Sequence, residues 1–516
     1  MSMNTAVRDW VAFNARRRPD HLALVDLATQ RRFSYAQMYE RVERAARYLA
    51  ATGIERGDRV AVLGRNSSDH LELLFASKRL GAIFVPMNWR LAAPELRYIV
   101  DDAAPAILFT SLEFAATAGE IIAPAKIATL DGSATETQYE AGLAAANLAR
   151  DLPAPPLDFD DTWILIYTSG TTGRPKGAII TYGTTFFNVV SHSMFTRLTS
   201  DSVTLIFGPL FHTGALSAYS IPCIHTGATV YVMRNFDAGE INHHISDPAM
   251  GITHINGAVT MYLLMSQHET FAQTDYSRLI CATISGESAP MSLLRRYHEE
   301  RGLPLQNIYG LTECGPCLTA LDRDTAVTKM GSIGTSVMYT EMRLVGPDGK
   351  DVAPGEVGEI WARGPNVSPG YWNNPEKTRD AFVDDWLKTG DAARCDADGY
   401  YFLIDRWKDM YISGGENVYP AEVENVLYQL DEIAEAAVIG VPHARWGECG
   451  RAIIVLKPGA ALDENRIVEH CRSQLAKFKV PASIVFTDTL PRSGGGKVVK
   501  PALRKLFGGA KPGSQS

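Results

Sequence analysis

The chain has 516 residues, 46% of them hydrophobic and 21% charged, which predicts two or more globular domains with sizeable cores. Its formal net charge of −8 excludes the basic footprint of a nucleic-acid-binding protein, and no apolar run approaches the length of a membrane span. Seven cysteines, an odd number, and an N-terminus without a signal-peptide-like apolar core predict a soluble protein of the reducing cytoplasm.

Residues 1–160 alternate strand and helix patterns, which predicts a parallel sheet with helices on its faces. Ser34 and Gln37 form a capping box before an amphipathic helix that stops at Gly53. The stretch 141–158, rich in Ala and Pro, is expected to be a connector. Buried strands are predicted at 60–63, 82–85 and 107–109, with helices at 71–80 and from Pro94.

The stretch Tyr167–Gly177, YTSGTTGRPKG, lies between two apolar strand patterns. Its glycines allow close approach of the backbone to a ligand, and successive backbone N–H groups in such a loop can surround an anion. The hydroxyl groups and Lys176 add donors that suit phosphate oxygens. Because Gly173 and Lys176 are separated by two residues, the order differs from that of a P-loop NTPase. Such a loop is most often a surface turn, and the lysine and arginine in it weaken that interpretation in favour of a phosphate-binding loop of another kind.

Strand and helix patterns continue to about residue 330. The run Phe207–Gly214 follows a strand and contains His212, which taken alone is most often a core histidine. A strand at 280–284 ends at Ser285, and strand ends in α/β sheets are where ligands usually bind. The strand end at Ser285 is therefore a candidate wall of a ligand site, and the role of His212 stays open at this point.

Cys314 and Cys317 form a C-x-x-C pair that imitates a redox motif. Thioredoxin-like chemistry would need the pair in a small βαβ domain, with the first cysteine opening a helix. A zinc site would need a second pair. The sequence therefore disfavours both redox chemistry and zinc binding for this pair.

The C-terminal part divides into two further regions. Short strand patterns between glycines over 331–404 predict a barrel-like subdomain. About a hundred residues beyond it carry their own β/α pattern, enough for a small domain. Helices are expected at 420–430 and 465–475, and strands at 436–441, 452–456 and 484–486.

Six stretches, in this order, resemble the motifs of the AMP-forming adenylating enzymes, which include acyl-CoA synthetases, luciferases and peptide-synthetase adenylation domains. The resemblance spans nearly the whole chain and points to the acyl-CoA synthetase branch. The stretches are 167–177, Tyr309-Gly310-Leu311-Thr312-Glu313, Lys388-Thr389-Gly390-Asp391, Asp405-Arg406-Trp407-Lys408-Asp409, Ser413-Gly414-Gly415-Glu416-Asn417 and 491–497.

The resemblance implies an α/β fold and a two-step reaction. A large N-terminal domain of packed α/β sheets with a β-barrel-like subdomain would span 1–405, a small mobile α+β domain 406–508, and a disordered tail 509–516. A carboxylic acid would react with ATP, with Mg²⁺ present, to an acyl-adenylate and pyrophosphate, and the thiol of coenzyme A would then displace AMP. Because the first step brings a carboxylate against a triphosphate, the site must neutralise charge and hold the reactants in line.

The resemblance also assigns the ATP site. Asp391 would accept the ribose hydroxyls, Arg406 would hold ribose or phosphate, and Tyr309 would stack on adenine. Glu313, helped by Thr168, would bind the magnesium ion, because hard oxygen ligands suit it. The remaining ATP- or AMP-binding residues are Thr168, Ser169, Gly170, Thr171, Thr172, Gly173, Lys176, Gly286, Glu287, Ser288, Gly310 and Thr312.

Two residues carry catalysis in this assignment. Lys497 would reach the α-phosphate and the carboxylate during adenylation and then leave, with the small domain rotating about a hinge at Lys408. His212 would gate the approach of the thiol and line the acid pocket. The other acid-pocket residues are Phe211, Asn256, Gly257, Ser285, Ile308 and Gly315, and the coenzyme A passage includes Gly414, Gly415 and Lys479. The roles of Glu287 and Ile308 within the pocket stay open.

Alternatives remain at this level. An adenylation protein that loads an amino acid or aryl acid onto a carrier usually has an aspartate where His212 stands, and no carrier domain follows. A luciferase-like oxidation is less favoured, and a catalytically dead relative is disfavoured by the joint presence of Lys497, Glu313 and Asp391. The mostly apolar pocket residues predict a hydrophobic acid, which could be a fatty acid, an aryl or hydroxycinnamic acid, or a steroid side-chain acid. The individual acid, the pathway and the oligomeric state, with a homodimer as one option, stay open.

Overall fold

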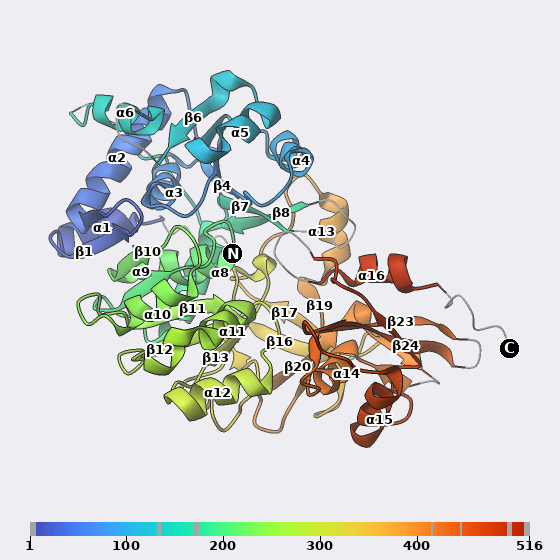
Figure 1. The fold of residues 1–516 in the computed structure, drawn as a ribbon. Helices are drawn as coiled ribbons and strands as arrows, with labels where there is room; N and C mark the ends of the chain where they lie inside the picture. Colours follow the sequence, from blue (N-terminus) through green and yellow to red (C-terminus); the bar gives the residue numbers. More distant parts are fainter. Residues whose placement is uncertain are drawn as a thin grey trace. The chain divides into compact units, whose positions relative to one another are not determined.

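The computed structural model describes residues 7–131, 136–149, 151–168, 175–413, 416–443, 446–492 and 498–509. The chain divides into two compact units (Figure 1). The first comprises Met1–Met342 with Ala362–Leu387, and the second comprises Arg343–Trp361 with Lys388–Ser516. The predicted domain limits, 1–405, 406–508 and 509–516, stay a prediction.

One sheet of the first unit has six strands in the order β6-β5-β3-β4-β7-β8. All neighbours are parallel except β8, which returns antiparallel to β7 as a hairpin. The strands are β3 (Arg59–Leu63), β4 (Ile83–Met87), β5 (Ile107–Ser111), β6 (Ile127–Leu130), β7 (Thr162–Thr168) and β8 (Lys176–Thr181). The helices in this part of the chain are α2 (Tyr35–Ala51), α3 (Ser68–Leu80), α4 (Ala93–Ala103), α5 (Ala115–Ile121) and α6 (Gln138–Ala145).

The predicted elements before residue 130 are present, and the capping box of α2 is confirmed. Gln37 donates its backbone N–H to Ser34 Oγ at 3.3 Å, and Ser34 donates its backbone N–H to Gln37 Oε1 at 2.8 Å. The expected connector is different, because its first five residues belong to α6. Thr137 caps that helix, and the buried ring of Tyr139 anchors it.

The second sheet of this unit has nine strands in the order β15-β14-β13-β12-β11-β9-β10-β1-β2. Its six central strands, from β13 to β1, are parallel. The strands are β1 (Leu22–Asp26), β2 (Arg31–Ser34), β9 (Val203–Ile206), β10 (Thr229–Val232), β11 (His254–Ala258), β12 (Cys281–Ser285), β13 (Gln306–Tyr309), β14 (Thr319–Ala320) and β15 (Thr335–Ser336). The other helices of this unit are α1 (Trp10–Arg17), α7 (Tyr182–Thr196), α8 (Thr213–Ala215), a π-helix (Leu216–Ser220), α9 (Ile221–Thr226), α10 (Ala238–Ser246), α11 (Val259–Gln267), α12 (Met291–Arg301) and α13 (Pro375–Ala381).

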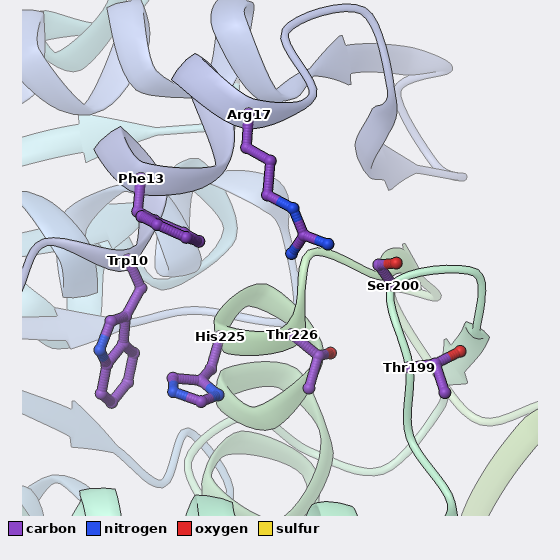
Figure 2. Close-up of a pocket in the computed structure, with 7 residues that line it drawn as sticks. All are labelled: Trp10, Phe13, Arg17, Thr199, Ser200, His225 and Thr226. Atoms are coloured by element: carbon purple, nitrogen blue, oxygen red, sulfur yellow. The ribbon is translucent and has the colours of Figure 1, made fainter.

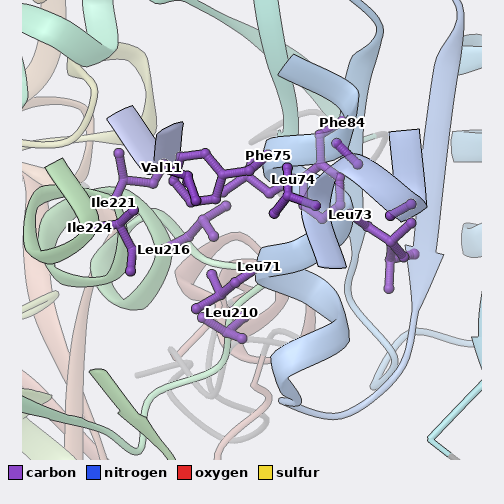
Figure 3. Packing of buried hydrophobic residues seen from close by; sticks show 14 of the residues in the cluster. Val11, Leu71, Leu73, Leu74, Phe75, Phe84, Leu210, Leu216, Ile221 and Ile224 are labelled. Atoms are coloured by element: carbon purple, nitrogen blue, oxygen red, sulfur yellow. The ribbon is translucent and has the colours of Figure 1, made fainter. Parts of the chain in front are cut away.

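Helix α3 lies between the two sheets and is buried on all sides. It contacts β1 of the nine-stranded sheet and both β3 and β4 of the six-stranded sheet. Leu71, Leu74 and Phe75 join side chains from α1, β4 and α9 in one core (Figure 3). A helix with no solvent face must place even its charged residues in the interior, and Asp69 and Glu72 are fully buried.

Lys78 near the end of α3 is also buried, and its ammonium group donates to the backbone oxygen of Arg8 at 2.6 Å. Burial lowers the pKa of Lys78 to about 8. The rings of Trp10, Trp163 and Tyr182 lie within 5.9 Å of Nζ and favour the charged form.

The lowered pKa of Lys78 predicts a pH dependence of stability. Between about pH 8 and pH 10.5 the unfolded chain binds this proton more tightly, so the free energy of unfolding rises with pH in this window. Relative to a Lys78→Met variant, we expect the free energy of unfolding of the wild-type protein to increase by up to about 3 kcal/mol over this pH range. Urea unfolding of both proteins at several pH values measures this gain, and parallel pH profiles would contradict it.

The residues expected to form a barrel-like subdomain contribute most of a five-stranded sheet. Its order is β16-β17-β19-β18, and β20 pairs with β19. These strands are β16 (Glu341–Val345), β17 (Val357–Arg363), β18 (Phe382–Val383), β19 (Trp386–Cys395) and β20 (Tyr401–Arg406).

A further five-stranded sheet follows in the second unit, in the order β22-β21-β24-β23 with β25 beside β24. Its strands are β21 (Tyr411–Ser413), β22 (Glu416–Val418), β23 (Ile433–His443), β24 (Gly447–Leu456) and β25 (Ser483–Phe486), and its helices are α14 (Pro420–Leu427), α15 (Glu464–Gln474) and α16 (Lys500–Phe507). The predicted elements are present here, and α16 is an addition.

The mixed α/β fold is confirmed. In the described part of the chain, no helix has the length and apolar character needed to cross a membrane.

Candidate active site

Four neighbouring parallel strands, β9, β11, β12 and β13, end at one edge of the nine-stranded sheet. Neighbouring parallel strands place their carboxyl ends together, and each of these four ends carries predicted site residues. The loop with Phe211 and His212 follows β9, Asn256 and Gly257 lie in β11, Ser285 ends β12, and Ile308 and Tyr309 end β13. The structure thus brings the predicted acid-pocket residues and the predicted adenine-stacking residue to one edge. Gly286, Glu287 and Ser288 follow β12 there and are exposed.

The loop after β9 is held by Asn66, a buried residue that the sequence analysis did not identify. Asn66 Nδ2 donates to Gly208 O at 2.8 Å, and Leu210 N donates to Asn66 Oδ1 at 2.8 Å. Phe211 is buried, and its ring centroid lies 4.6 Å from that of the half-buried His212. A lone asparagine 142 residues before its partner gives no local signal.

Glu313 lies in the 3₁₀ turn Thr312–Cys314, and its Oε1 accepts a hydrogen bond from Tyr371 Oη at 2.6 Å. Lys176 Nζ lies 5.0 Å from the centroid of the same tyrosine ring. Burial, and then the negative charge of Glu313, raise the pKa of Tyr371, so the phenol stays a donor. Tyr371 therefore joins a predicted magnesium ligand to a predicted phosphate-binding lysine. It was missed because a tyrosine in a Pro/Gly-rich loop carries no local signal.

Backbone hydrogen bonds explain why Lys176 and Glu313 share this tyrosine. The segment 368–372 bonds to the turn that holds Glu313 and also to β8, which begins at Lys176. These bonds run from Ser368 N to Glu313 O (2.8 Å), from Ile179 N to Gly370 O (3.0 Å) and from Trp372 N to Gly177 O (2.8 Å).

The phosphate loop is described only at its two ends. Thr168, the last residue of β7, pairs in register with Lys176, the first residue of β8. Both are half-buried. The predicted residues Ser169, Gly170, Thr171, Thr172 and Gly173 lie outside the described part of the chain.

The turn after Tyr309 requires a glycine. A Cβ on Gly310 would lie 1.9 Å from the backbone oxygen of Pro316, so no other residue fits without moving the backbone. Gly315 has φ +70°, a conformation that favours glycine. Tyr309 is buried, and its backbone oxygen accepts from the backbone N–H of Leu318 at 2.9 Å, which closes the turn.

The C-x-x-C pair belongs to this turn and is buried. No disulfide joins any of the seven cysteines, all of which lie among the described residues. Burial raises the pKa of Cys317 and so disfavours the thiolate that redox chemistry requires. A packing role fits both cysteines.

The second unit holds the predicted ribose-binding pair. Asp391 and Arg406 are register partners in β19 and β20, and Arg406 Nε lies 3.0 Å from Asp391 Oδ1. The Asp391 side chain is only 6% exposed. Lys479 forms an ion pair with Glu422. Lys408 belongs to the 3₁₀ turn Trp407–Asp409, but its side chain is not described. The other predicted residues of this unit that lie outside the described part of the chain are Gly414, Gly415 and Lys497.

The donors present fit a magnesium ion that is bound partly by phosphates. Among the described residues, no group of three or more His, Cys, Asp or Glu side chains could hold a metal ion. Magnesium is usually bound by one or two carboxylates together with substrate phosphates and water. The single carboxylate of Glu313, oriented by Tyr371, matches that requirement.

A surface hollow of about 400 Å³ lies elsewhere in the first unit (Figure 2). Residues from α1 and α9 and from the loop before β9 form it, and no predicted site residue is among them. The lining residues are Trp10, Phe13, Arg17, Thr199, Ser200, His225 and Thr226.

Comparisons with known proteins identify the family of the chain. The AMP-binding enzyme profile matches residues 11–372, and the profile of the AMP-binding enzyme C-terminal domain matches residues 422–497. Feruloyl-CoA synthase of Amycolatopsis sp is 40% identical over 98% of this chain and 100% of its own length. Indoleacetate–CoA ligase of Aromatoleum aromaticum is 38% identical over 96% of this chain and 97% of its own length.

Among solved structures, ATP-bound MatB from Rhodopseudomonas palustris is similar with a TM-score of 0.88 and 31% identity. The match covers 98% of this chain and 99% of that one. The resemblance drawn from the motifs is thereby confirmed, and the chain belongs to the AMP-binding enzyme family, in its acyl-CoA synthetase branch.

Proposed function

We propose that the protein is an ATP-dependent acid–CoA ligase. It converts a carboxylic acid, ATP and coenzyme A into an acyl-CoA, AMP and pyrophosphate through an acyl-adenylate. The observation that carries the proposal is the cluster of Lys176, Glu313 and Tyr371, in the same unit as a sheet edge with apolar pocket residues. Relatives named as CoA ligases over nearly the full chain length support it.

The cluster suits the charge problem of the first step. Lys176 donates to phosphate oxygens, and Glu313 holds Mg²⁺, which neutralises phosphate charge when bound. Tyr371 fixes one oxygen of Glu313, so the carboxylate is oriented before the nucleotide arrives. Asp391 accepts from the ribose hydroxyls, and its ion pair with Arg406 orients it.

The acid is proposed to be hydrophobic, and aromatic in the first instance. Phe211, Gly257 and Ile308 are buried and apolar at the sheet edge. The two relatives are named for feruloyl-CoA and indoleacetate, both aromatic. A fatty acid is the second candidate.

We further propose that Lys497 acts only in adenylation and that the small C-terminal domain rotates about Lys408 between the two half-reactions. Gly414, Gly415 and Lys479 would then shape the coenzyme A passage. The proposed location is the cytoplasm, a reducing compartment in which cysteines without disulfides are expected.

The test is pyrophosphate release from ATP and Mg²⁺ with a panel of aromatic, fatty and amino acids, each with and without coenzyme A. Release that one acid class supports, accelerated by coenzyme A with AMP and acyl-CoA as products, is expected. Release with amino acids and no effect of coenzyme A would favour the carrier-loading alternative. No release with any acid, with ATP binding intact, would favour the catalytically inactive alternative.

The Glu313 carboxylate predicts a change in magnesium dependence. In Glu313→Gln the amide oxygen still accepts from Tyr371, but the charge that binds the ion is lost. We expect pyrophosphate release to need a higher Mg²⁺ concentration and to fall about 10²-fold or more at saturation. Tyr371→Phe keeps the charge and loses only the orienting bond, so a loss of about 10-fold is expected. A magnesium titration of both variants measures this, and an unshifted titration of Glu313→Gln would contradict the assignment.

A further inference from the structure

A chain of hydrogen bonds runs from the interior of the first unit to the predicted acid pocket. Thr283 Oγ1 donates to Asn256 Oδ1 at 2.9 Å and lies 2.8 Å from Tyr219 Oη. Tyr219 Oη lies 3.7 Å from Cys281 Sγ. At the other end, Asn256 Nδ2 donates to Gly214 O at 3.1 Å.

The direction of every bond follows from the groups at the pocket end. The carbonyl of Gly214 can only accept, so the amide nitrogen of Asn256 faces it and the amide oxygen faces Thr283. Thr283 has one hydroxyl proton, and Asn256 Oδ1 at 2.9 Å is a nearer acceptor for it than the backbone oxygen of Ile255 at 3.5 Å. Thr283 therefore donates to Asn256 and accepts from Tyr219. The oxygen of Tyr219 then accepts from the thiol of Cys281.

Burial keeps the interior members neutral. It raises the pKa of Tyr219 and raises that of Cys281 to about 12. Both groups therefore retain their protons at physiological pH, and the chain has one direction. Buried hydrogen bonds of this kind reinforce one another and fix side-chain orientation.

The chain connects elements of the predicted site. Asn256 and Thr283 are register partners in β11 and β12, and Cys281 lies two residues before Thr283 on the same face. Tyr219 belongs to the π-helix that directly follows α8, and π-helices frequently occur at functional sites. Gly214 lies in α8, whose N-terminal cap is His212.

The solvent exposure of the residues changes along this chain of hydrogen bonds. Tyr219 and Thr283 are fully buried, whereas Asn256 and Gly214 are partly exposed. The buried part can therefore act on a ligand only through the exposed end. That end consists of the Asn256 amide and the turn that begins at His212.

We propose that Tyr219 and Thr283 are positioning residues of the acid site. They set the orientation of the Asn256 amide and hold the turn that carries His212, and in this way they determine how tightly the acid binds. The inference rests on the proposed acid–CoA ligase function, since the acid site is assigned through it.

The test compares Tyr219→Phe and Thr283→Val with two matched controls. Tyr276→Phe and Tyr297→Phe each remove one buried hydroxyl, but these donate to Asn242 Oδ1 (3.2 Å) and to the backbone oxygen of Tyr262 (2.8 Å), and neither belongs to the hydrogen-bond chain. Loss of one neutral hydrogen bond weakens a binding constant by about 3- to 10-fold. We expect the KM for the acid to rise by that factor in Tyr219→Phe and Thr283→Val, with the KM for ATP and kcat unchanged. Thr283→Ser, which keeps the hydroxyl, restores the wild-type KM, and the controls do not change it.

A second readout needs no substrate. The backbone N–H of Leu216 bonds to His212 O at 3.1 Å, so looser packing of this turn speeds hydrogen exchange there. We expect faster exchange in a peptide spanning 210–218 in Tyr219→Phe and Thr283→Val, and no change in the two controls. If the wild-type protein activates no acid, the proposed function fails while exchange still tests the positioning. Equal effects in variants and controls, or no effect on exchange, would overturn the inference.

Discussion

Replacing Lys497 with alanine is expected to reduce acyl-adenylate formation by about 10²- to 10³-fold, the loss typical of a charge-stabilising donor. Thioester formation from pre-made acyl-adenylate is expected to proceed at close to the wild-type rate. During adenylation, negative charge gathers where the carboxylate meets the α-phosphorus, and an ammonium group there stabilises it. In the second step the same group would occupy the path of the thiol, so its removal costs little.

The measurement separates the two half-reactions. Pyrophosphate exchange follows adenylation, and acyl-CoA formation from synthetic adenylate follows thiol transfer. Lys505→Ala is the matched control, because Lys505 is an exposed lysine of α16. Equal loss in both half-reactions would show that Lys497 supports folding or general binding and not adenylation.

Much of the fold could be predicted because the deciding signals are local. Apolar runs of three or four residues mark β3, β4 and β5, and each strand is buried throughout or nearly so. The capping box at Ser34 needs only a residue three positions away. Element order then favours the parallel sheet, since strands that alternate with helices pair in that way.

The site was predictable where a motif carries its own spacing, as at Glu313 and at Lys176. Tyr371 and Asn66 were not, because each acts across 58 or more residues. No local pattern distinguishes such a tyrosine or asparagine from one in an ordinary loop. Helix α6 was missed for a related reason, since its alanines fit a connector and the buried contact of Tyr139 decides the outcome.

The burial of charged side chains is the property that is hardest to predict from the sequence. The acids of α3 resemble those of a surface helix until the two sheets enclose it. Glu72, with no exposed side chain, accepts from Arg41 Nε at 2.8 Å and from Tyr139 Oη at 2.8 Å. Arg41 also pairs with Glu140. Replacing Arg41 would therefore leave a carboxylate in the interior without its cation.

Arg41→Ala is expected to lower the free energy of unfolding by about 3–5 kcal/mol, the cost of breaking a buried ion pair. Arg44→Ala, three residues along the same helix, removes an ion pair with the half-exposed Glu40 and hydrogen bonds to the backbone oxygens of Leu143 and Ala146 (3.3 Å each). It should cost about 1–2 kcal/mol. Urea unfolding of both variants gives the comparison. Equal losses would show that the interior pair contributes no more than the surface one.

The pH dependence adds a sharper test of the same pair. Burial raises the pKa of Glu72, and Arg41 acts in the opposite direction, so the pKa rises further in the variant. A carboxyl whose pKa is raised by folding loses stability as the pH rises from its unfolded value, near 4.5, towards its folded value. The difference between wild type and Arg41→Ala should therefore be smaller at pH 5 than at pH 8, because Glu72 takes up a proton in the variant. A difference that does not change with pH would mean that Glu72 finds another cation when Arg41 is absent.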